Sequence, residues 1–379
     1  RLARPALYTL ITLALAIMLA GCSGQPTPTA EALPTRALRP TFTPYPTVTL
    51  APTVTPPPTL TPVPPTPTVQ PSFTPDPSVN PLTGLHVDDP AKLARRVLAV
   101  RIGNDPEIRP QEGLGLADIV YEEIMDGWTV TRFTALYLAD DIERLRPIRS
   151  ARLCSLAIAP QYDAALVHSG ASDPIRWLIS QASGFVDLDQ YFHAVPYAML
   201  AGYDWRGRMY TSVTALRDYM AKKGLERDTP IQGYAFDSAA PPGEPALSIH
   251  IPYPRSSVVD WTYDATAGRY LRAVQGAPHL EGLTKQQIAA ENVIVFYAEH
   301  KKTDIVEDSL GSTAIDIVME GSGRAQLCRD GVVQELRWER RAPGALIQYY
   351  DAAGEVAPLK PGRTWIQLVP VDYAVEIKG

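Results

Sequence analysis

Residues 23–80 are too rich in proline and threonine to form a folded core, because these 58 positions hold 17 prolines and 14 threonines. Proline fixes its own backbone φ angle and biases the residue before it towards extended geometry. We therefore expect a disordered, semi-stiff tether whose reach is on the order of 180 Å, at about 3.1 Å per residue. The threonines beside proline either carry O-linked sugars or belong to a bare spacer.

The N-terminus has the features of a secretory signal that ends at a lipid-attachment cysteine. Arg1 and Arg4 precede an almost uncharged run, residues 5–20, which is too short to span a bilayer as a mature helix. The sequence Leu-Ala-Gly-Cys at 19–22 is typical of a lipobox, in which the cysteine is acylated and becomes the mature N-terminus. We expect a signal peptide over 1–22, lipid on Cys22 and a location on the extracytoplasmic face of the cell membrane. The alternative is a buried cysteine in an ordinary helix.

The remaining residues, 81–379, are acidic. Residues 1–80 hold four of the 35 Lys and Arg and two of the 41 Asp and Glu, which leaves 31 basic and 39 acidic residues and a formal charge of −8. A negatively charged protein repels the phosphates of nucleic acid, so we do not expect nucleic acid as a partner. Beyond Cys22 only Cys154 and Cys328 remain, both in apolar runs, which favours two buried thiols over a disulfide. Their spacing fits neither a metal site nor a redox site, and we expect no metal and no cofactor.

Residues 81–230 predict an N-terminal domain of mixed α/β type. Strands are expected at 97–102, 117–122, 130–138 and 164–168, with a hairpin turn at 125–128. Helices are expected at 151–159 with Ser150 as N-cap, at 174–181, and at 212–223 before Gly224. Residues 184–208 are rich in Gly, Asp, Tyr and Arg, and they predict a long surface loop, a feature that often carries function.

Residues 231–379 predict a second, β-rich domain. A Pro/Gly-rich boundary at 231–244 precedes it. Short strands are expected at 247–251, 257–263, 268–274, 293–298, 314–319, 323–329, 332–339, 346–350 and 364–369. The predicted fold class is therefore α+β, with an α/β part followed by a β-rich part that shares an interface with it.

Three arginines spaced three residues apart, Arg146, Arg149 and Arg152, form the first candidate site. The last two flank the expected start of the helix 151–159, where free backbone N–H groups and the helix dipole favour an anion. Guanidinium groups add bidentate contacts to phosphate or carboxylate. The alternative is structural, with these arginines paired to carboxylates of the adjacent strand, namely Asp118, Glu122 or Glu123.

Other candidates lie nearby in the sequence. His168 and Ser169 close a strand, where α/β proteins place ligands, although a hydrogen-bonded structural histidine is the alternative. Glu122 belongs to a group of carboxylates that could include a glycosidase pair. Aromatic residues of the 184–208 loop either stack on sugar rings or pack in the core; they are Tyr191, Tyr197, Tyr203 and Trp205. The motifs HExxH, GxSxG and GxxxxGK[ST] are all missing from the sequence.

A set of motifs extends over both parts of the chain. They include Arg109-Pro110-Gln111, Ala-Asp-Ile-Val-Tyr-Glu at 117–122, Thr131-Arg132-Phe133, Pro-Ile-Arg-Ser-Ala-Arg at 147–152, Trp-Thr-Tyr-Asp at 261–264 and Pro-Gly-Arg-Thr-Trp at 361–365. Together they resemble the YerB-like bacterial lipoproteins, whose domain is one of unknown function (number 3048), over about residues 80–370. The resemblance implies a lipid-anchored surface protein with an N-terminal and a C-terminal domain and no settled activity.

The family motifs contain two further candidate binding residues, Arg132 and Tyr210. Family members usually carry His-Asn before Tyr-Thr-Ser, whereas here Gly207, Arg208 and Met209 precede Tyr210. Since neither Gly nor Arg accepts a proton at neutral pH, no general base is expected at this position.

Two functional classes follow. The first is a non-catalytic envelope protein that binds a partner protein or an anionic wall polymer. The second is an envelope hydrolase or transferase acting on phosphorylated glycan or lipid-linked sugar. The sequence favours the first, because it contains no recognisable nucleophile or metal set. An enzyme would need Arg149, Arg152 and His168 to converge with a carboxylate in one pocket.

Overall fold

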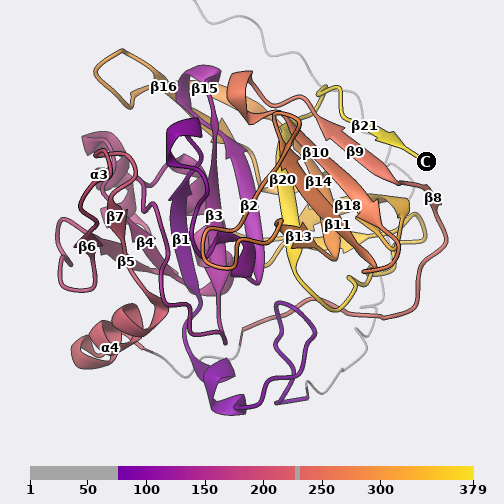
Figure 1. Ribbon diagram of the computed structural model, residues 1–379, viewed down its shortest axis with the longest axis horizontal. Coiled ribbons are helices and arrows are strands. Elements are labelled where there is room, and N and C mark those ends of the chain that lie inside the picture. Colours follow the sequence, from indigo (N-terminus) through magenta and orange to yellow (C-terminus); the bar gives the residue numbers. More distant parts are fainter. Residues whose placement is uncertain (1–75, 227–230) are drawn as a thin grey trace, which may run out of the picture. The chain divides into compact units, whose positions relative to one another are not determined.

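The computed structural model of the chain describes residues 76–226 and 231–379 (Figure 1). The expected signal peptide, Cys22 and residues 23–75 of the expected tether lie outside the described residues. The described residues belong to one compact unit. In the described part of this unit, no helix has both the length and the apolar character needed to cross a membrane.

The main feature is an 11-stranded sheet. Its strands are β1 (Leu98–Gly103), β2 (Ile119–Ile124), β3 (Thr131–Tyr137), β4 (Ala165–His168), β5 (Val186–Asp189), β8 (Glu244–Pro245), β14 (Asn292–Ala298), β17 (Gly321–Arg329), β18 (Val332–Arg340), β19 (Gln348–Tyr350) and β20 (Thr364–Pro370). The order is β19-β18-β17-β14-β20-β2-β3-β1-β4-β5, and β8 pairs with β18.

The late strand β20 joins the two parts of the chain, because it pairs in parallel with β2 on one side and β14 on the other. Strand β3 is antiparallel to β2 and β1, whereas β1, β4 and β5 run parallel. Strands from both predicted parts therefore share one sheet. The domain boundary at residue 230 stays a prediction.

A second sheet of six strands covers one face of the main sheet at β14 and β20 (Figure 1). Its strands are β9 (Ser248–Ile251), β10 (Val259–Asp264), β11 (Arg269–Val274), β12 (Ala277–Pro278), β13 (Ala289–Ala290) and β21 (Glu376–Lys378). Two small sheets pair β6 (Ala198–Met199) with β7 (Met209–Tyr210), and β15 (His300–Val306) with β16 (Thr313–Ile317).

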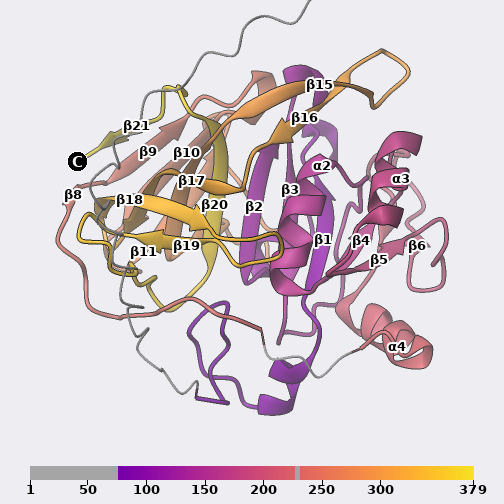
Figure 2. The ribbon, with the colours of Figure 1, turned by 180° about the vertical axis from the view of Figure 1, so that it is seen from behind.

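Three α-helices complete the described regular structure: α2 (Leu153–Ile158), α3 (Asp173–Gln181) and α4 (Val213–Lys223). Helix α2 lies on the other face of the main sheet, over β1 and β3 (Figure 2). Short 3₁₀ turns occur at Pro90–Ala94, Pro106–Ile108, Leu114–Leu116, Asp126–Trp128, Ala159–Tyr162 and Arg255–Ser257. Because both faces are covered, every residue of β1, β2, β3, β14 and β20 is buried.

The predicted fold class is confirmed, since a mixed α/β sheet with few helices is followed by a β-rich part. Helix α4 begins after Ser212, whose hydroxyl accepts from the Ala215 N–H (3.1 Å), and ends at Gly224 in the left-handed conformation, as predicted. Cys154 and Cys328 are buried and free, also as predicted.

Candidate anion-binding site

Residues 147–151 lie between the C-terminal ends of β1 and β4. On one side, the Gly103 N–H donates to the Pro147 carbonyl (3.1 Å) and the Arg149 N–H donates to the Arg101 carbonyl (2.9 Å). On the other side, the Ser169 N–H donates to the Arg149 carbonyl (3.1 Å) and the Ala151 N–H to the Gly170 carbonyl (2.9 Å). The segment is therefore held to both strands through its backbone.

These bonds delay the start of helix α2. The helix has six residues, and its N-cap is Arg152, so the prediction that Ser150 is the N-cap is wrong. The N–H groups of Ala151 and Arg152 already have partners, the latter being Ser155 Oγ at 3.1 Å. Attraction for an anion at this place comes from guanidinium groups, because the expected free N–H groups at Ala151 and Arg152 are occupied.

Three guanidinium groups gather beside this segment: Arg132, Arg149 and Arg152, which we call the arginine cluster. Arg132 lies on β3 opposite Gly103 of β1. Gly103 allows Arg149 to lie against the strand, since a Cβ atom there would stand 2.7 Å from Arg149 Cγ. Burial, reinforced by the positive charges of Arg152 and Arg149, holds the pKa of Arg132 well below its ordinary value.

The cluster has one positive charge without a carboxylate partner. Arg149 Nη2 is 3.9 Å from Asp105 Oδ2, and Arg152 Nε is 2.6 Å from Asp126 Oδ2. Arg132 is only 6% exposed and donates from Nη1 to the Ser150 carbonyl (3.2 Å). Among residues 76–226 and 231–379, Arg132 forms no ion pair. Asp126 acts on its charge without a direct contact. A buried cation that lacks a direct ion pair marks a place where a bound anion would be stabilised.

Two exposed aromatic rings border the cluster: Tyr203 and Trp205, 48% and 67% exposed, which we call the aromatic rim. The Arg149 guanidinium carbon lies 5.1 Å from the centre of the Trp205 ring. The Arg146 guanidinium carbon lies 4.3 Å from the centre of the Tyr203 ring. Such contacts hold the rings in place without removing them from solvent.

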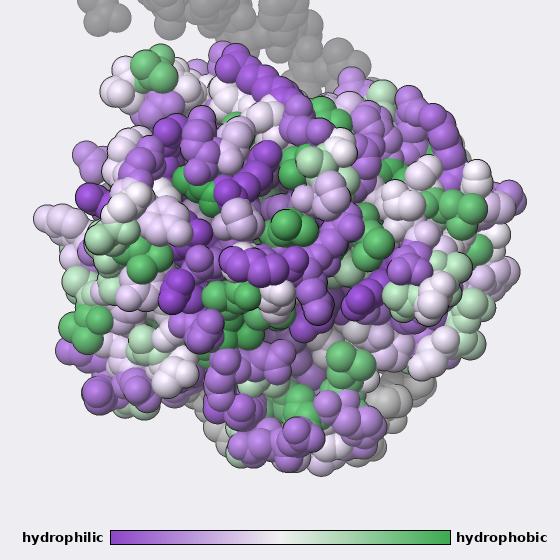
Figure 3. Space-filling view, in the orientation of Figure 1, coloured by the Kyte–Doolittle hydropathy of each residue, from purple (hydrophilic) through white to green (hydrophobic). Residues whose placement is uncertain are grey.

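The loop that carries the aromatic rim also includes exposed apolar residues, such as Phe192, Val195 and Met199. In Figure 3, hydrophobic residues form separate groups among hydrophilic ones, one of them at the left edge, where Figure 1 places β6. The 184–208 segment, predicted as a loop, contains the unpredicted strand β5 as well.

Arg146 contacts Tyr203 of the aromatic rim and is already paired with a carboxylate. Its Nη2 lies 3.2 Å from Glu112 Oε1, and its Nη1 donates to the Gly207 carbonyl (3.0 Å). Tyr210, on β7, lies elsewhere, under the Arg144 guanidinium at 5.6 Å. The structure therefore brings Arg146 to the rim but leaves Tyr210 outside the arginine cluster.

His168 and Ser169 adjoin the cluster through the backbone. The His168 ring is fully buried, with Nδ1 2.9 Å from the Gly170 carbonyl and Nε2 2.7 Å from Asp187 Oδ1. Both ring nitrogens are therefore engaged.

Glu122 points to the opposite face of the sheet from its neighbour Glu123, as side chains alternate along a strand. It accepts from Arg272 Nη2 at 3.0 and 2.9 Å and from Thr131 Oγ1 at 2.7 Å. Glu123 faces α2 and pairs with Arg101 at 2.5 Å. The structural alternative, in which Arg146, Arg149 or Arg152 pairs with Asp118, Glu122 or Glu123, is wrong in its partners. The three arginines pair instead with Glu112, Asp105 and Asp126.

Glu122 also belongs to a closed ring of buried hydrogen bonds between the two sheets. Thr131 accepts from Asn104 Nδ2 (2.7 Å), and Asn104 Oδ1 accepts from Gln111 Nε2 (3.1 Å). His279 then links Gln111 Oε1 (2.8 Å from its Nε2) to Arg272 at its Nδ1. Burial, together with the charges of Arg272 and Arg109, holds the pKa of His279 well below its ordinary value, so the imidazole of His279 is neutral.

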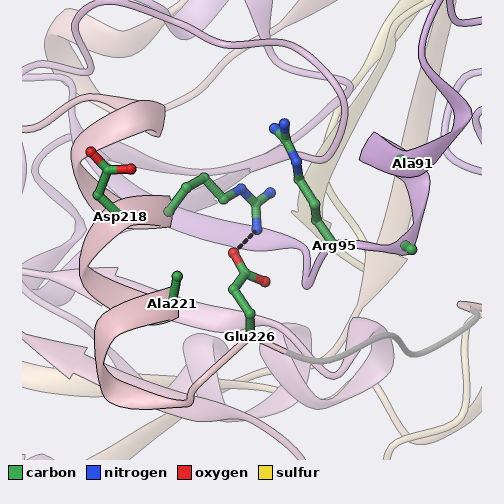
Figure 4. Close-up of a pocket in the computed structure, with 7 residues that line it drawn as sticks. Ala91, Arg95, Asp218, Ala221 and Glu226 are labelled. Carbon is green, nitrogen blue, oxygen red and sulfur yellow. Dashed lines mark hydrogen bonds and ion pairs between the residues drawn. The ribbon is translucent and has the colours of Figure 1, made fainter.

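Two surface cavities lie away from these groups. One, of about 420 Å³, is lined by Arg95, Arg217, Asp218 and Glu226 with small alanines, and Arg217 pairs with Glu226 at 2.9 Å (Figure 4). The other, of about 390 Å³, lies on the six-stranded sheet beside His250 and Asp260. Neither is lined by a predicted binding residue.

The fold and the site describe a mixed α/β protein whose two parts share one sheet and whose buried arginines lie at a strand end. These features do not assign it a chemical reaction. Two family models match the chain, described as "Protein of unknown function (DUF3048) N-terminal domain" over residues 82–226 and the corresponding C-terminal domain over residues 249–366. The chain therefore belongs to the DUF3048 family, and the resemblance predicted from the motifs is confirmed.

A curated relative is "Putative lipoprotein YerB" of Bacillus subtilis (strain 168), 29% identical over 311 residues, which are 79% of this chain and 88% of the relative. The crystal structure of the YerB protein from Bacillus subtilis matches with a TM-score of 0.69 at 27% identity. That match covers 79% of this chain and 99% of the crystallised chain.

Proposed function

We propose that this protein is anchored by lipid on Cys22 to the extracytoplasmic face of the cell membrane and binds an anionic, sugar-containing polymer of the envelope. The arginine cluster and the aromatic rim would form the binding site. One observation supports the proposal: the Arg132 guanidinium is buried, flanked by two further arginines and in no direct ion pair with a carboxylate of the described residues.

An anion at the cluster would relieve the repulsion among the three guanidinium groups. Charge-assisted bonds from arginine to phosphate or carboxylate are short and roughly twice as strong as neutral ones. Water cannot fully replace an anion beside Arg132, because the side chain is almost completely buried. Phosphate fits this position well, since its oxygens can accept hydrogen bonds from more than one guanidinium group.

The aromatic rim favours a ligand that also contains sugar rings. Tyr203 and Trp205 present flat, exposed faces, and such faces can bury the apolar side of a sugar. An acidic segment of a partner protein would offer carboxylates without sugar rings. Nucleic acid does not suit the acidic folded part of the chain.

The geometry supports binding over catalysis. Glu122 lies on the opposite face from the cluster and is held by Arg272, and both nitrogens of His168 are engaged. A hydrolase or transferase acting on phosphorylated glycan would need an accessible acid or base beside the bound anion. Turnover of the ligand during the binding experiment would support that alternative.

Replacing Arg132 with glutamine is expected to weaken the binding of a phosphorylated oligosaccharide about tenfold to a hundredfold, because one charge-assisted contact is lost. Arg149→Lys keeps the charge but not the fork, so it should lose part of the affinity. Isothermal titration of the full chain measures both. Arg324→Gln on β17 is the matched control, because that exposed arginine pairs with Glu335 at the surface.

The unphosphorylated oligosaccharide and inorganic polyphosphate separate the contributions of sugar and charge. Trp205→Ala should weaken the phosphorylated oligosaccharide but not polyphosphate. If Arg132→Gln keeps both the affinity and the melting temperature of the parent, the arginine cluster is not the binding site. Equal binding of polyphosphate and phosphorylated oligosaccharide would point to an acidic partner without sugar.

Replacing Cys22 with alanine is expected to abolish lipid attachment and to move the protein from the membrane fraction to soluble or uncleaved forms. The lipobox at 19–22 motivates this expectation, and the relative carries the name "Putative lipoprotein YerB". Metabolic labelling with a clickable fatty acid measures it. Equal label in the parent and in Cys22→Ala would contradict the anchor.

A further inference from the structure

The hairpin β15–β16 projects from the body of the protein (Figure 2). The hairpin is anchored along the length of strand β16, because Ala314, Ile315 and Ile317 are buried. Its tip is exposed, and Leu310 at the turn is 89% exposed, the highest value among the large hydrophobic residues of the described chain. One side chain of this tip, that of Glu307, is buried instead.

Glu307 begins the tip, and its N–H donates to the Ser312 carbonyl (2.8 Å). Its side chain has no exposed area and lies beside the arginine cluster, with Oε2 3.6 Å from Arg152 Nε. Burial raises the pKa of this carboxyl, an effect that the Arg152 charge partly offsets. The exposed hairpin thus carries a carboxylate into the positively charged interior.

This carboxylate is poorly bound there. Both Glu307 oxygens are buried without a hydrogen bond of standard length and angle to any described residue. The Ser172 hydroxyl stabilises the charge from nearby, but it too lacks a bond of standard geometry. Arg152 has a closer partner in Asp126, at 2.6 Å. A buried carboxylate in such a position is easily exchanged for an anion that bonds better.

We propose that the β15–β16 hairpin is a lid over the arginine cluster, with Glu307 as an internal substitute for the anion of the ligand. The ligand binds by displacing Glu307, and the tip, residues 307–312, swings out from the anchored strand β16. This inference rests on the proposed function of the cluster, because it describes how that same site is regulated. It predicts that the closed protein binds more weakly than a protein whose lid is free.

The structure offers a way to lock the lid. A Cβ atom built on Gly127, in the β2–β3 turn, would stand 3.5 Å from Ser312 Cβ at the hairpin tip. This separation suits a disulfide bond. The double variant Gly127→Cys/Ser312→Cys, in a full chain that also carries Cys22→Ala, can therefore be locked by oxidation and released by reduction. The left-handed backbone at Gly127 strains both forms equally, so the comparison between them is unaffected.

The locked form is expected to bind the phosphorylated oligosaccharide at least about tenfold more weakly than the same protein after reduction, a change of about 1.4 kcal/mol. The single variant Ser312→Cys should bind equally under both conditions. Mass spectrometry verifies that the disulfide is complete. Equal affinity of the locked and reduced forms would overturn the lid.

Charge removal gives a second readout. Glu307→Gln should bind about tenfold more tightly than the parent, whereas Asp304→Asn, an exposed change of the same charge on the same hairpin, should bind like the parent. If the parent binds but Glu307→Gln is no tighter, the lid is wrong and the site stands. If neither the parent nor Glu307→Gln binds the oligosaccharide, polyphosphate or phosphate, the function proposed for the cluster fails, and the lid with it.

Discussion

Replacing Arg272 with methionine is expected to lower the free energy of unfolding by about 3–5 kcal/mol, because the substitution leaves a buried carboxylate unpaired. Arg272 and Glu122 are both fully buried, and two hydrogen bonds of 2.9 and 3.0 Å join them. Three aromatic rings surround the guanidinium, and the nearest, Trp365, is 4.9 Å from its carbon. Neither water nor another cation can take its place in this setting.

The loss should extend to the closed ring of hydrogen bonds, since His279 would lose its partner at Nδ1. Urea unfolding followed by circular dichroism measures the change. The double variant Arg272→Met/Glu122→Gln removes both charges and should recover part of the stability. Arg324→Met breaks an exposed pair and should cost less than about 1 kcal/mol. A similar small cost for Arg272→Met would show that the buried pair does not stabilise the joined sheets.

The second large effect concerns pH. Burial raises the pKa of the Asp118 carboxyl from 3.8 to about 7, despite the hydrogen bonds that it accepts from the Leu138 N–H (2.7 Å) and Asn80 Nδ2 (3.0 Å). The folded state therefore holds this proton more tightly than the unfolded state. The contribution of Asp118 to stability is fully present below about pH 4 and is lost as the pH rises through about 7. The total loss is at most about 4 kcal/mol, at 1.36 kcal/mol per pKa unit.

Replacing Asp118 with asparagine is expected to remove this pH dependence. The variant should be less stable than the parent at low pH by about 1 kcal/mol, because the amide replaces one acceptor with a donor. It should become the more stable protein above about pH 5, where the loss in the parent exceeds this difference. Urea midpoints measured across this window give the difference directly. Parallel stability curves for the two proteins would contradict the raised pKa of Asp118.

Much of the fold could be predicted from local patterns. Strands β1, β2, β14 and β20 are short runs of β-forming residues between turn signals, and Ser212 and Gly224 delimit α4. Strand β15 escaped prediction because its sequence, His-Lys-Lys-Thr-Asp-Ile-Val, is mostly polar and half of it faces solvent. The Ser150 cap was wrong because bonds to β1 and β4 keep the segment extended, a constraint that lies outside the local sequence.

Long-range pairing is the part that sequence patterns do not contain. Nothing in the neighbourhood of Glu122 indicates that its partner is Arg272, 150 residues later. The insertion of β20 between β2 and β14 is equally non-local. For the site, the sequence singled out Arg132, Arg149, Arg152 and Trp205. It gave no signal for Asp105 or Glu307, which meet the arginines only after the chain has folded.

Hydrogen exchange of the full chain, with and without the phosphorylated oligosaccharide, locates the bound ligand without any substitution. Binding at the arginine cluster and aromatic rim predicts slower exchange at residues 147–152 and 203–206, with faster exchange at 305–312 as the lid opens. Slower exchange confined to other segments, such as those lining the cavity of Arg95 and Glu226, would contradict an anion site at the cluster.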